Sequence, residues 1–317
     1  MLKKIIKACL SEDQMRQVTN YRIKQKYLKN KKILKNISDK ENYINNQFEK
    51  EFGYKIDFTK EPKTFSEKIQ FRKIYSSNKK NELYTLCSDK YLVREYVAKK
   101  IGKEFLIPLL LVTKKLSLEQ WEKLPDKFVA KANHNSGPVQ IVSNKNKENA
   151  KKIIAELEFQ LKIDYGVISL EEFYSNIPKK IIIEKFLNFK GKSMQDYKFH
   201  CFNSGEIFVE HILERNENVK EKKVLKTNFY DENWNKLNFS IGTEIYNENI
   251  NKPKNFEKMK NIAKKLAEDF DYVRVDLYNL DGKIYFGELT FSGDSGLQEF
   301  SIKKWNIKFG EIWNQQL

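Results

Sequence analysis

The most constraining feature of this sequence is a pair of alternating segments near its C-terminal end, separated by Asp281-Gly282. The segment 272–278 places Arg274 and Asp276 on one face of a strand and three aliphatic residues on the other. The segment 284–291 follows, and Asp-Gly between two such runs is typical of a β-hairpin. One face of this ribbon therefore covers an apolar core, while the other carries charge.

On the second strand, four residues are expected to share a face: Ile284, Phe286, Glu288 and Thr290. A three-residue loop, 280–282, would place Arg274 opposite Glu288 and Asp276 diagonal to it, with Cα atoms about 7–8 Å apart. Two carboxylates at this spacing can share Mg²⁺, and the hydroxyl of Thr290 can add a ligand. Arg274 could meet a phosphate or an oxyanion. The alternative interpretation is an exposed salt bridge between Arg274 and Glu288.

Two other strands end in charged residues. Lys131 lies in the predicted strand 127–132, directly before the polar loop 134–138, and a lysine beside loop amides suits phosphate groups. An exposed lysine on an edge strand would explain the same pattern. Glu184-Lys185 closes the apolar strand 181–187, where backbone groups beside an apolar slot could bind an adenine edge. An ordinary strand exit explains this second pattern as well.

The rest of the chain alternates helical patterns with antiparallel pairs of strands. Residues 1–60 are polar, lysine-rich and mostly helical in pattern. A capping box begins at Thr64. Helices are expected over 64–74, 88–100, 150–161 and 256–270, and further hairpins over 127–142 and 197–209. This order predicts an α+β fold with antiparallel sheets.

Composition limits the compartment and the chemistry. The net charge of +16 indicates an anionic partner or a coding bias toward Lys, Asn and Ile. Three cysteines without a CxxC pair argue against disulfides and a Cys-based zinc site, and they fit a reducing cytoplasm. No segment is long enough to span a bilayer, and the amphipathic stretch 1–10 allows at most peripheral membrane contact. No common nucleic-acid module is recognised, so no nucleic-acid partner is expected.

Six stretches together resemble the TupA-like ATP-grasp family, which is linked to teichuronopeptide and other surface-polysaccharide biosynthesis. They are Pro62–Ile69, Ser88–Arg94, Leu124–Lys131, Asn133–Gly137, Asp196–Phe199 and Gly287–Phe291. The resemblance extends from about residue 55 to the end. It implies an ATP-grasp fold, in which two α+β lobes with antiparallel sheets clasp ATP, plus a helical N-terminal extension.

The resemblance also implies a division of the chain and a role for each motif residue. The expected parts are a helical basic N-terminal extension (1–60), a helical start of the catalytic region (61–125), a small lobe with the Lys131 strand, phosphate loop and adenine strand (126–190), and a large lobe with the Mg²⁺ hairpin (191–317). ATP would contact Lys90, Lys131, His134, Asn135, Ser136, Gly137, Glu184, Lys185 and Leu187. Catalysis would use Arg274 and Lys198. The metal would be held by Asp276, Glu288 and Thr290, and the acceptor substrate would be bound by Ser292, Gly293 and Asp294.

Two departures from the family pattern concern the metal and the phosphates. Thr290 stands where many ATP-grasp enzymes have asparagine, and it is a weaker ligand. The loop 134–138 holds a single glycine, so it is poorer in glycine than the flexible phosphate loop of the family pattern.

These features lead to an expected reaction and two alternatives. The first is an ADP-forming ligase that uses Mg-ATP to activate a carboxylate as an acyl-phosphate and joins it to an amine. Its expected substrates are an amino acid or amine and a uronic acid or glycan carboxylate, with an acidic polysaccharide or nucleotide-sugar as partner. The first alternative is an ATP-grasp sugar kinase. The second is a nucleotide-sugar-dependent glycosyltransferase, an enzyme class that often carries a DxD metal motif.

Overall fold

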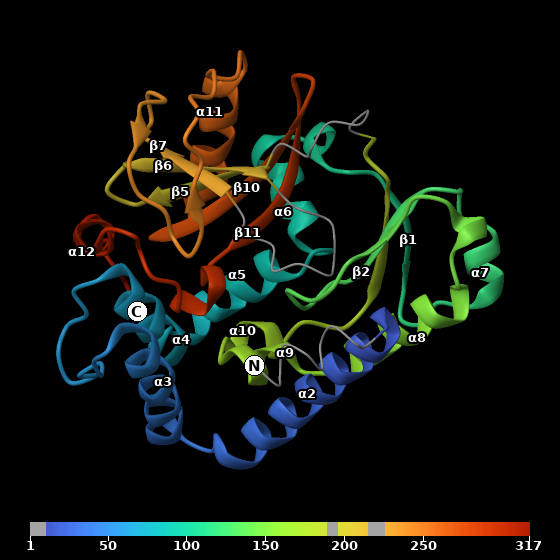
Figure 1. Cartoon of the computed structure of the whole chain (residues 1–317), viewed down its shortest axis with the longest axis horizontal. Helices are drawn as coiled ribbons and strands as arrows, with labels where there is room; N and C mark the ends of the chain where they lie inside the picture. Colours follow the sequence, from blue (N-terminus) through green and yellow to red (C-terminus); the bar gives the residue numbers. More distant parts are fainter. Residues whose placement is uncertain (1–10, 189–195, 215–225) are drawn as a thin grey trace.

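The computed structural model describes residues 11–188, 196–214 and 226–317. Two antiparallel sheets organise the chain (Figure 1), with strand orders β1-β4-β2-β3 and β11-β10-β5-β6-β7-β8. The short strand β9 pairs with β7 in parallel. The strands are β1 (Leu109–Thr113), β2 (Phe128–Ala132), β3 (Gln140–Val142), β4 (Ile181–Lys185), β5 (Asp196–Phe202), β6 (Ile207–Glu214), β7 (Lys226–Tyr230), β8 (Lys236–Leu237), β9 (Glu244–Ile245), β10 (Tyr272–Leu280) and β11 (Lys283–Thr290).

Helices surround both sheets and confirm the predicted α+β layout. They are α2 (Glu12–Ile33), α3 (Ile37–Phe52), α4 (Phe65–Tyr75), α5 (Asn78–Ser88), α6 (Val93–Ile101), α7 (Leu118–Glu122), α8 (Ala150–Lys162), α9 (Tyr165–Ser169), α10 (Glu172–Ser175), α11 (Phe256–Ala267) and α12 (Lys303–Ile312). The apolar side of the smaller sheet packs against α7 and α8 through Trp121, Phe128 and Leu157. Helix α11 covers the apolar side of the larger sheet (Figure 1).

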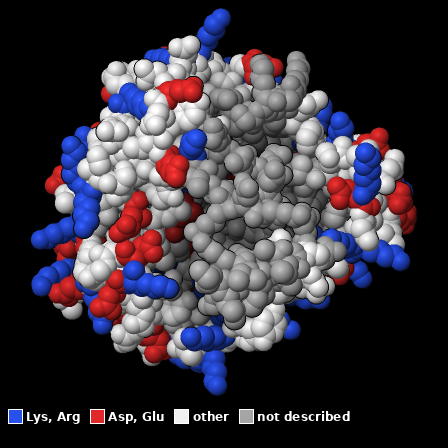
Figure 2. Space-filling model, viewed as in Figure 1, with Lys and Arg blue, Asp and Glu red and all other residues white. Residues whose placement is uncertain are grey.

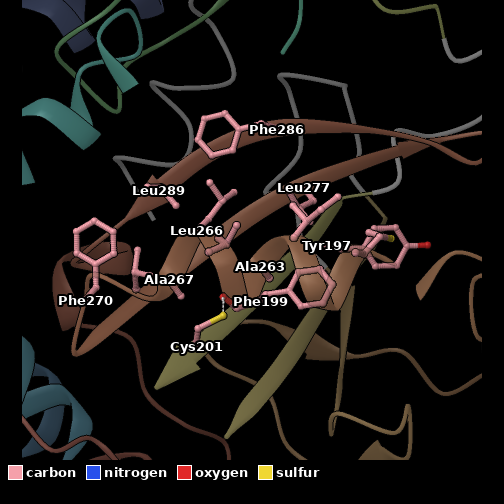
Figure 3. Packing of buried hydrophobic residues seen from close by; sticks show 14 of the residues in the cluster. Tyr197, Phe199, Cys201, Ala263, Leu266, Ala267, Phe270, Leu277, Phe286 and Leu289 are labelled. Atoms are coloured by element: carbon pink, nitrogen blue, oxygen red, sulfur yellow. Dashed lines mark hydrogen bonds between the residues drawn. The ribbon is translucent and has the colours of Figure 1, made fainter. Parts of the chain in front are cut away.

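The main core shows why the strands of the larger sheet alternate in polarity. Leu266 and its neighbours on α11 pack against Phe199 of β5 and Leu277 of β10 (Figure 3). All three of these side chains are fully buried. Because successive residues of a strand point to opposite faces, burying this side directs the charged residues of β5 and β10 to the other side.

Helix α4 begins as predicted, with the Thr64 side chain accepting from the backbone amide of Glu67 in a capping box. The helix predicted over 88–100 is wrong at its start, because α5 ends at Ser88 and α6 begins only at Val93. Between them the Asp89 carboxylate accepts from the Tyr91 amide at 2.8 Å, which favours a turn over a continuous helix.

The N-terminal region is helical, as predicted, and α2 runs along the lower edge of the molecule (Figure 1). Asn20 donates to Glu156 of α8 at 2.7 Å, and Asn30 donates to the Val167 carbonyl of α9 at 3.0 Å. The stretch 1–10 lies outside the described residues. Within the described ranges, no helix combines the length and apolarity that a bilayer crossing requires. The four-part division of the chain stays a prediction.

Candidate active site

The polar face of the β10–β11 hairpin gathers four side chains. Arg274 donates through Nε and Nη2 to the two carboxylate oxygens of Asp276, at 2.8 and 2.9 Å. Its Nη2 also donates to Thr290 Oγ1 at 3.1 Å and lies 3.6 Å from Glu288 Oε1. Asp276 and Arg274 are buried, whereas the Glu288 side chain remains 40% exposed. The hairpin therefore presents one partly open carboxylate beside a buried ion pair.

The hairpin register differs from the prediction. Asp281 and Gly282 both have positive φ and form a two-residue turn, so Leu280 pairs with Lys283 and the three-residue loop is wrong. An irregularity at Gly287 then brings Asp276 directly opposite Glu288. A Cβ on Gly287 would lie 3.0 Å from the Asp276 carbonyl oxygen, so the close approach favours glycine there.

This bulge also corrects the predicted faces of β11. Phe286 and Ile284 pack in the main core, together with Leu289. Glu288 and Thr290 instead point toward Arg274 on the polar side. The four residues predicted to share a face are thus divided, because an unpaired residue in a strand exchanges the faces of the residues that follow.

Strands β5 and β6 extend the charged surface. Lys198 lies opposite Asp276 in the pairing of β5 with β10, and its Nζ donates to Asp276 Oδ2 at 2.6 Å. Glu210 lies opposite Lys198 in the pairing of β5 with β6, and its carboxylate is 3.7 Å from His200 Nε2. Both Glu210 and His200 are buried. The sequence prediction included Lys198 and missed Glu210.

The electrostatics keep this cluster ionised. Burial alone would raise the pKa of Asp276, but the charges of Arg274 and Lys198 and their hydrogen bonds hold it below its ordinary value. Burial and Arg274 act to lower the pKa of Lys198, yet Asp276, Asp196 and Glu210 together raise it. The cluster is thus a set of desolvated charges that compensate one another.

A second charged cluster lies on the smaller sheet. Lys131 Nζ is 2.6 Å from Glu184 Oε2, and Arg94 Nη1 is 3.5 Å from Glu184 Oε1. Strand β2, which carries Lys131, lies between β4 and β3, so the edge-strand alternative is wrong. Arg94 belongs to a stretch that carried the family resemblance, but it was not predicted as a site residue. The feature that identifies Arg94 as a site residue is its ion pair with Glu184, and the sequence alone does not show this pair.

Lys90 connects the two clusters electrostatically. Its Nζ donates to the Asn135 carbonyl at 2.6 Å. Burial lowers the pKa of Lys90, and Glu288 of the hairpin opposes this more than Glu184 or Asp89 does. The neighbouring charge of Lys131 acts with burial. The charged groups of both sheets therefore face a common region.

The loop after β2 is held by its own side chains. His134 is fully buried, its Nε2 lies 3.1 Å from the Ile163 carbonyl, and burial lowers its pKa to about 4. Asn135 donates to Gln160 at 3.1 Å and accepts from the Gly137 amide at 3.2 Å. Only Ser136 of these is exposed, and it lines the main cleft. The ring of His134 therefore anchors the loop, and any phosphate contact at this position would use the backbone.

Two residues predicted for the adenine site have simpler surroundings. Lys185 is exposed at the end of β4, with its amide donating to the Pro108 carbonyl at 2.9 Å. Leu187 is half-buried. Their role in adenine binding stays a prediction.

A cleft of about 1430 Å³ lies beside the hairpin cluster. In Figure 2, acidic side chains gather to the left of the centre on this side of the molecule. The predicted residues that line the cleft are Ser136, Lys198, Arg274, Glu288, Thr290, Ser292 and Asp294. The lining also includes residues that were not predicted, among them Tyr165, Glu171, Tyr174 and Glu210.

The segment after β11 forms one wall of the cleft. Ser292 Oγ is buried and has no hydrogen-bond partner among the described residues. A Cβ on Gly293 would lie 2.9 Å from Arg274 Nη1, so this position lets the backbone pass close to the guanidinium. Asp294 and Ser295 adopt left-handed backbone conformations, with φ of 45° and 60°. Strained residues of this kind are common where a loop is shaped for a ligand.

The donor set of the hairpin suits a magnesium ion. Asp276 and Glu288 lie directly opposite each other across β10 and β11, with the Thr290 hydroxyl 3.2 Å from Glu288 Oε1. Hard oxygen ligands of this type, completed by phosphate oxygens and water, match the preference of Mg²⁺. No group of three or more His, Cys, Asp or Glu side chains suited to a metal occurs within 11–188, 196–214 and 226–317. A metal at the hairpin would therefore depend on ligands supplied by a substrate.

The spacing Asp269-Phe270-Asp271 matches a DxD motif, but its carboxylates have structural partners. Asp271 is buried and bonded to Arg72. Asp269 accepts from Tyr96 at 3.0 Å and lies 2.7 Å from Lys100. The DxD spacing therefore gives no support to the glycosyltransferase alternative.

The two antiparallel sheets and their facing charged clusters match the ATP-grasp class that the sequence resemblance implied. The chain belongs to the TupA-like ATP-grasp family, since a family model described as TupA-like ATPgrasp matches residues 67–314. The predicted family and fold are thereby confirmed. A search of curated proteins found no similar sequence.

Similar solved structures include three ligases. The D-alanine–D-alanine ligase of Bacillus anthracis is 18% identical, with 65% of this chain and 57% of that chain covered at a TM-score of 0.37. The D-alanine–D-alanine ligase of Helicobacter pylori is 16% identical, with 72% of this chain and 61% of that chain covered at a TM-score of 0.39. D-alanyl-alanine synthetase A of Vibrio cholerae is 14% identical, with 67% of this chain and 57% of that chain covered at a TM-score of 0.42. The chain thus spans less than two thirds of the length of each of these proteins.

Proposed function

We propose that this chain is an ATP-dependent carboxylate–amine ligase that works through an acyl-phosphate. The observation that carries the proposal is the convergence of Arg274, Lys198 and Glu288 on the wall of a large cleft, around the buried carboxylate of Asp276. Membership of an ATP-grasp family supports the nucleotide as the energy source. Lys131 of the smaller sheet and Lys90, which lies between α5 and α6, supply further positive charge for phosphates.

In the proposed reaction, a carboxylate oxygen of the acid attacks the γ-phosphorus of ATP, and the bond to the ADP oxygen breaks. The amine then attacks the acyl carbon, inorganic phosphate leaves, and the amine proton passes to solvent or a nearby base. Lys90 and Lys131 would hold the phosphates, while Arg274 and Lys198 would stabilise the charge on the moving phosphoryl group. Asp276, Glu288 and Thr290 would hold Mg²⁺, which when bound supplies charge compensation at the phosphates.

The acid substrate that we propose is a uronic acid or glycan carboxylate, joined to an amino acid or amine during surface-polysaccharide biosynthesis in the cytoplasm. The cleft is large enough for a substrate beyond the nucleotide. Its lining also includes hydroxyl and amide side chains and a lysine that suit a polyhydroxylated acid. They are Ser240, Thr243, Ser301, Lys303 and Asn306. Ser292, Gly293 and Asp294 would contact the acceptor close to Arg274.

The test is a screen of acids and amines for ADP and phosphate release by the purified protein. Release should require both substrates and stop when EDTA removes Mg²⁺. Hydroxylamine in place of the amine should give a hydroxamate, because it captures an acyl-phosphate. A phosphorylated product that resists hydroxylamine would replace the ligase by the sugar kinase. ATP turnover that is indifferent to every amine would also overturn the ligase.

A further inference from the structure

The positive charge of the chain is densest over residues 14–38, most of which belong to α2. Residues 14–38 contain eight Lys and Arg residues and no Asp or Glu. This segment alone carries half of the net charge of +16, although it is a small fraction of the 317 residues. A uniform compositional bias would spread the charge along the chain, so α2 and the turn that follows it form a distinct basic segment.

The basic residues of α2 point mainly outward. Its inner side is held to the rest of the protein by Asn20 and Asn30. Arg22, Lys24, Lys29, Lys31 and Lys32 are all exposed. Basic side chains project from the lower edge of the molecule in Figure 2, where α2 runs in Figure 1. With 22 residues, the helix presents this side over about 33 Å.

Apolar side chains lie on the same outer side. Tyr21 is 63% exposed and Leu28 is 47% exposed, and both stand at helical spacing with Val18 and Lys32. Large apolar side chains gain nothing from such exposure in water. The outer face of α2, defined by Val18, Tyr21, Leu28 and the exposed Arg22, Lys24, Lys29 and Lys32, thus combines positive charge with apolar groups.

We propose that the outer face of α2 docks the protein onto an anionic lipid surface. A basic helix that lies flat places its lysines among the lipid headgroups and its apolar side chains at the acyl boundary. A lipid surface would therefore contact both the positive charges and the apolar side chains of the outer face of α2. The docking is independent of the proposed ligase reaction, because it involves none of the cleft residues.

Two other occupants fit the face less well. A second copy of the chain would bring two basic stripes together, and the like charges would repel each other. A soluble acidic polymer would neutralise the lysines and leave Tyr21 and Leu28 exposed. A lipid surface is the partner that matches the charge and the apolar groups together.

The experiment is co-sedimentation of the full chain with vesicles of phosphatidylglycerol and phosphatidylcholine, and with phosphatidylcholine alone, at near-physiological salt. The protein should sediment with the anionic vesicles only. A charge variant replaces four basic residues of the face by glutamine: Arg22, Lys24, Lys29 and Lys32. With about fivefold per basic residue, its partition should fall by at least about a hundredfold.

A matched control removes the same charge from exposed lysines of other regions. These are Lys127, Lys147, Lys264 and Lys304, each replaced by glutamine, and partition should change by less than about fivefold because they lie off the face. An apolar variant, Tyr21→Ser with Leu28→Ser, has the same charge as the wild type and should bind at least about tenfold more weakly. Circular dichroism checks that every variant is folded.

Three results would overturn the proposal. The wild-type protein could stay in the supernatant with anionic vesicles. The control variant could lose as much binding as the charge variant, which would indicate a nonspecific effect of total charge. The apolar variant could bind as well as the wild type, which would indicate a general polyanion site such as one for an acidic polymer. Because ADP release is measured separately, failure here leaves the ligase proposal untouched.

Discussion

Replacing Glu288 by glutamine should separate the chemistry of the hairpin from its stability. The substitution keeps the volume of the side chain and removes its charge. Glu288 is 40% exposed, its oxygen lies 3.6 Å from Arg274, and it accepts from Thr290 at 3.2 Å. A partly exposed ion pair of this length contributes at most about 1 kcal/mol, so the free energy of unfolding should fall by no more than that.

The neighbouring carboxylate gives the contrast. Asp276 is buried, and both of its oxygens accept from Arg274, with Lys198 as a further donor. Asp276→Asn would leave two desolvated cations without their anionic partner. Breaking a buried pair in this way costs about 3–5 kcal/mol. Asp276→Asn should therefore lose both stability and activity, and Glu288→Gln only activity.

Both variants are compared by urea unfolding and by steady-state ADP release. Glu288→Gln should reduce turnover by about a hundredfold or more, because the substitution removes a carboxylate charge that would hold the Mg²⁺ at the phosphates. Near-wild-type turnover of Glu288→Gln would refute the assignment of this carboxylate to the metal. A loss of several kcal/mol in the same variant would show that Glu288 is structural.

Four further predictions rest on individual contacts. Gly293→Ala should lower turnover about tenfold or more at nearly unchanged melting temperature, because its Cβ would lie 2.9 Å from Arg274 Nη1 and displace that side chain. Lys73 and Glu171 are both buried, and each opposes the pKa shift that burial imposes on the other, so the losses of stability caused by Lys73→Met and Glu171→Gln in urea unfolding should be non-additive, with the double variant losing less than the sum of the single variants. Burial raises the pKa of Glu171 from 4.5 to about 7, so the native state retains a proton that the unfolded chain releases. As the pH rises from about 4.5 to above 7, the wild type should lose the stability that this proton contributes. Unfolding of the wild type and of Glu171→Gln across this pH range measures the difference. Thr64→Ala should cost about 1 kcal/mol in the same unfolding assay through loss of the capping box of α4.

The alternation of polar and apolar residues was sufficient to predict the hairpin and its charged face. It placed Arg274, Asp276 and Glu288 on one side of the ribbon, and the structure brings these side chains together. The register was missed because an extra residue at Gly287 changes the pairing without changing the composition of the strands. Two signals were present in the sequence, since Asp-Gly favours a two-residue turn and a glycine within a strand often marks a bulge.

The missed site residues are those whose role depends on pairing between distant segments. Glu210 lies beside Lys198 only after β6 pairs with β5, and Arg94 meets Glu184 only after α6 packs near β4. His134 shows the opposite case, a polar residue in a predicted loop that the fold buries completely. Local patterns report the face of a strand, but they do not report which strands become neighbours or which loop residues turn inward.

Two of the cations that we propose for the phosphates and the moving phosphoryl group already have carboxylate partners, and this limits which ligands can bind tightly. Lys131 is 2.6 Å from Glu184, and Lys198 is 2.6 Å from Asp276. A phosphate that takes either lysine therefore exchanges one anion for another and leaves a carboxylate in a desolvated setting, which is costly. A triphosphate that arrives with Mg²⁺ brings the compensating cation for Asp276 and Glu288, whereas a metal-free nucleotide does not. Nucleotide affinity measured by calorimetry should thus depend steeply on Mg²⁺ in the wild type. Equal affinity with and without the metal would contradict this exchange of partners.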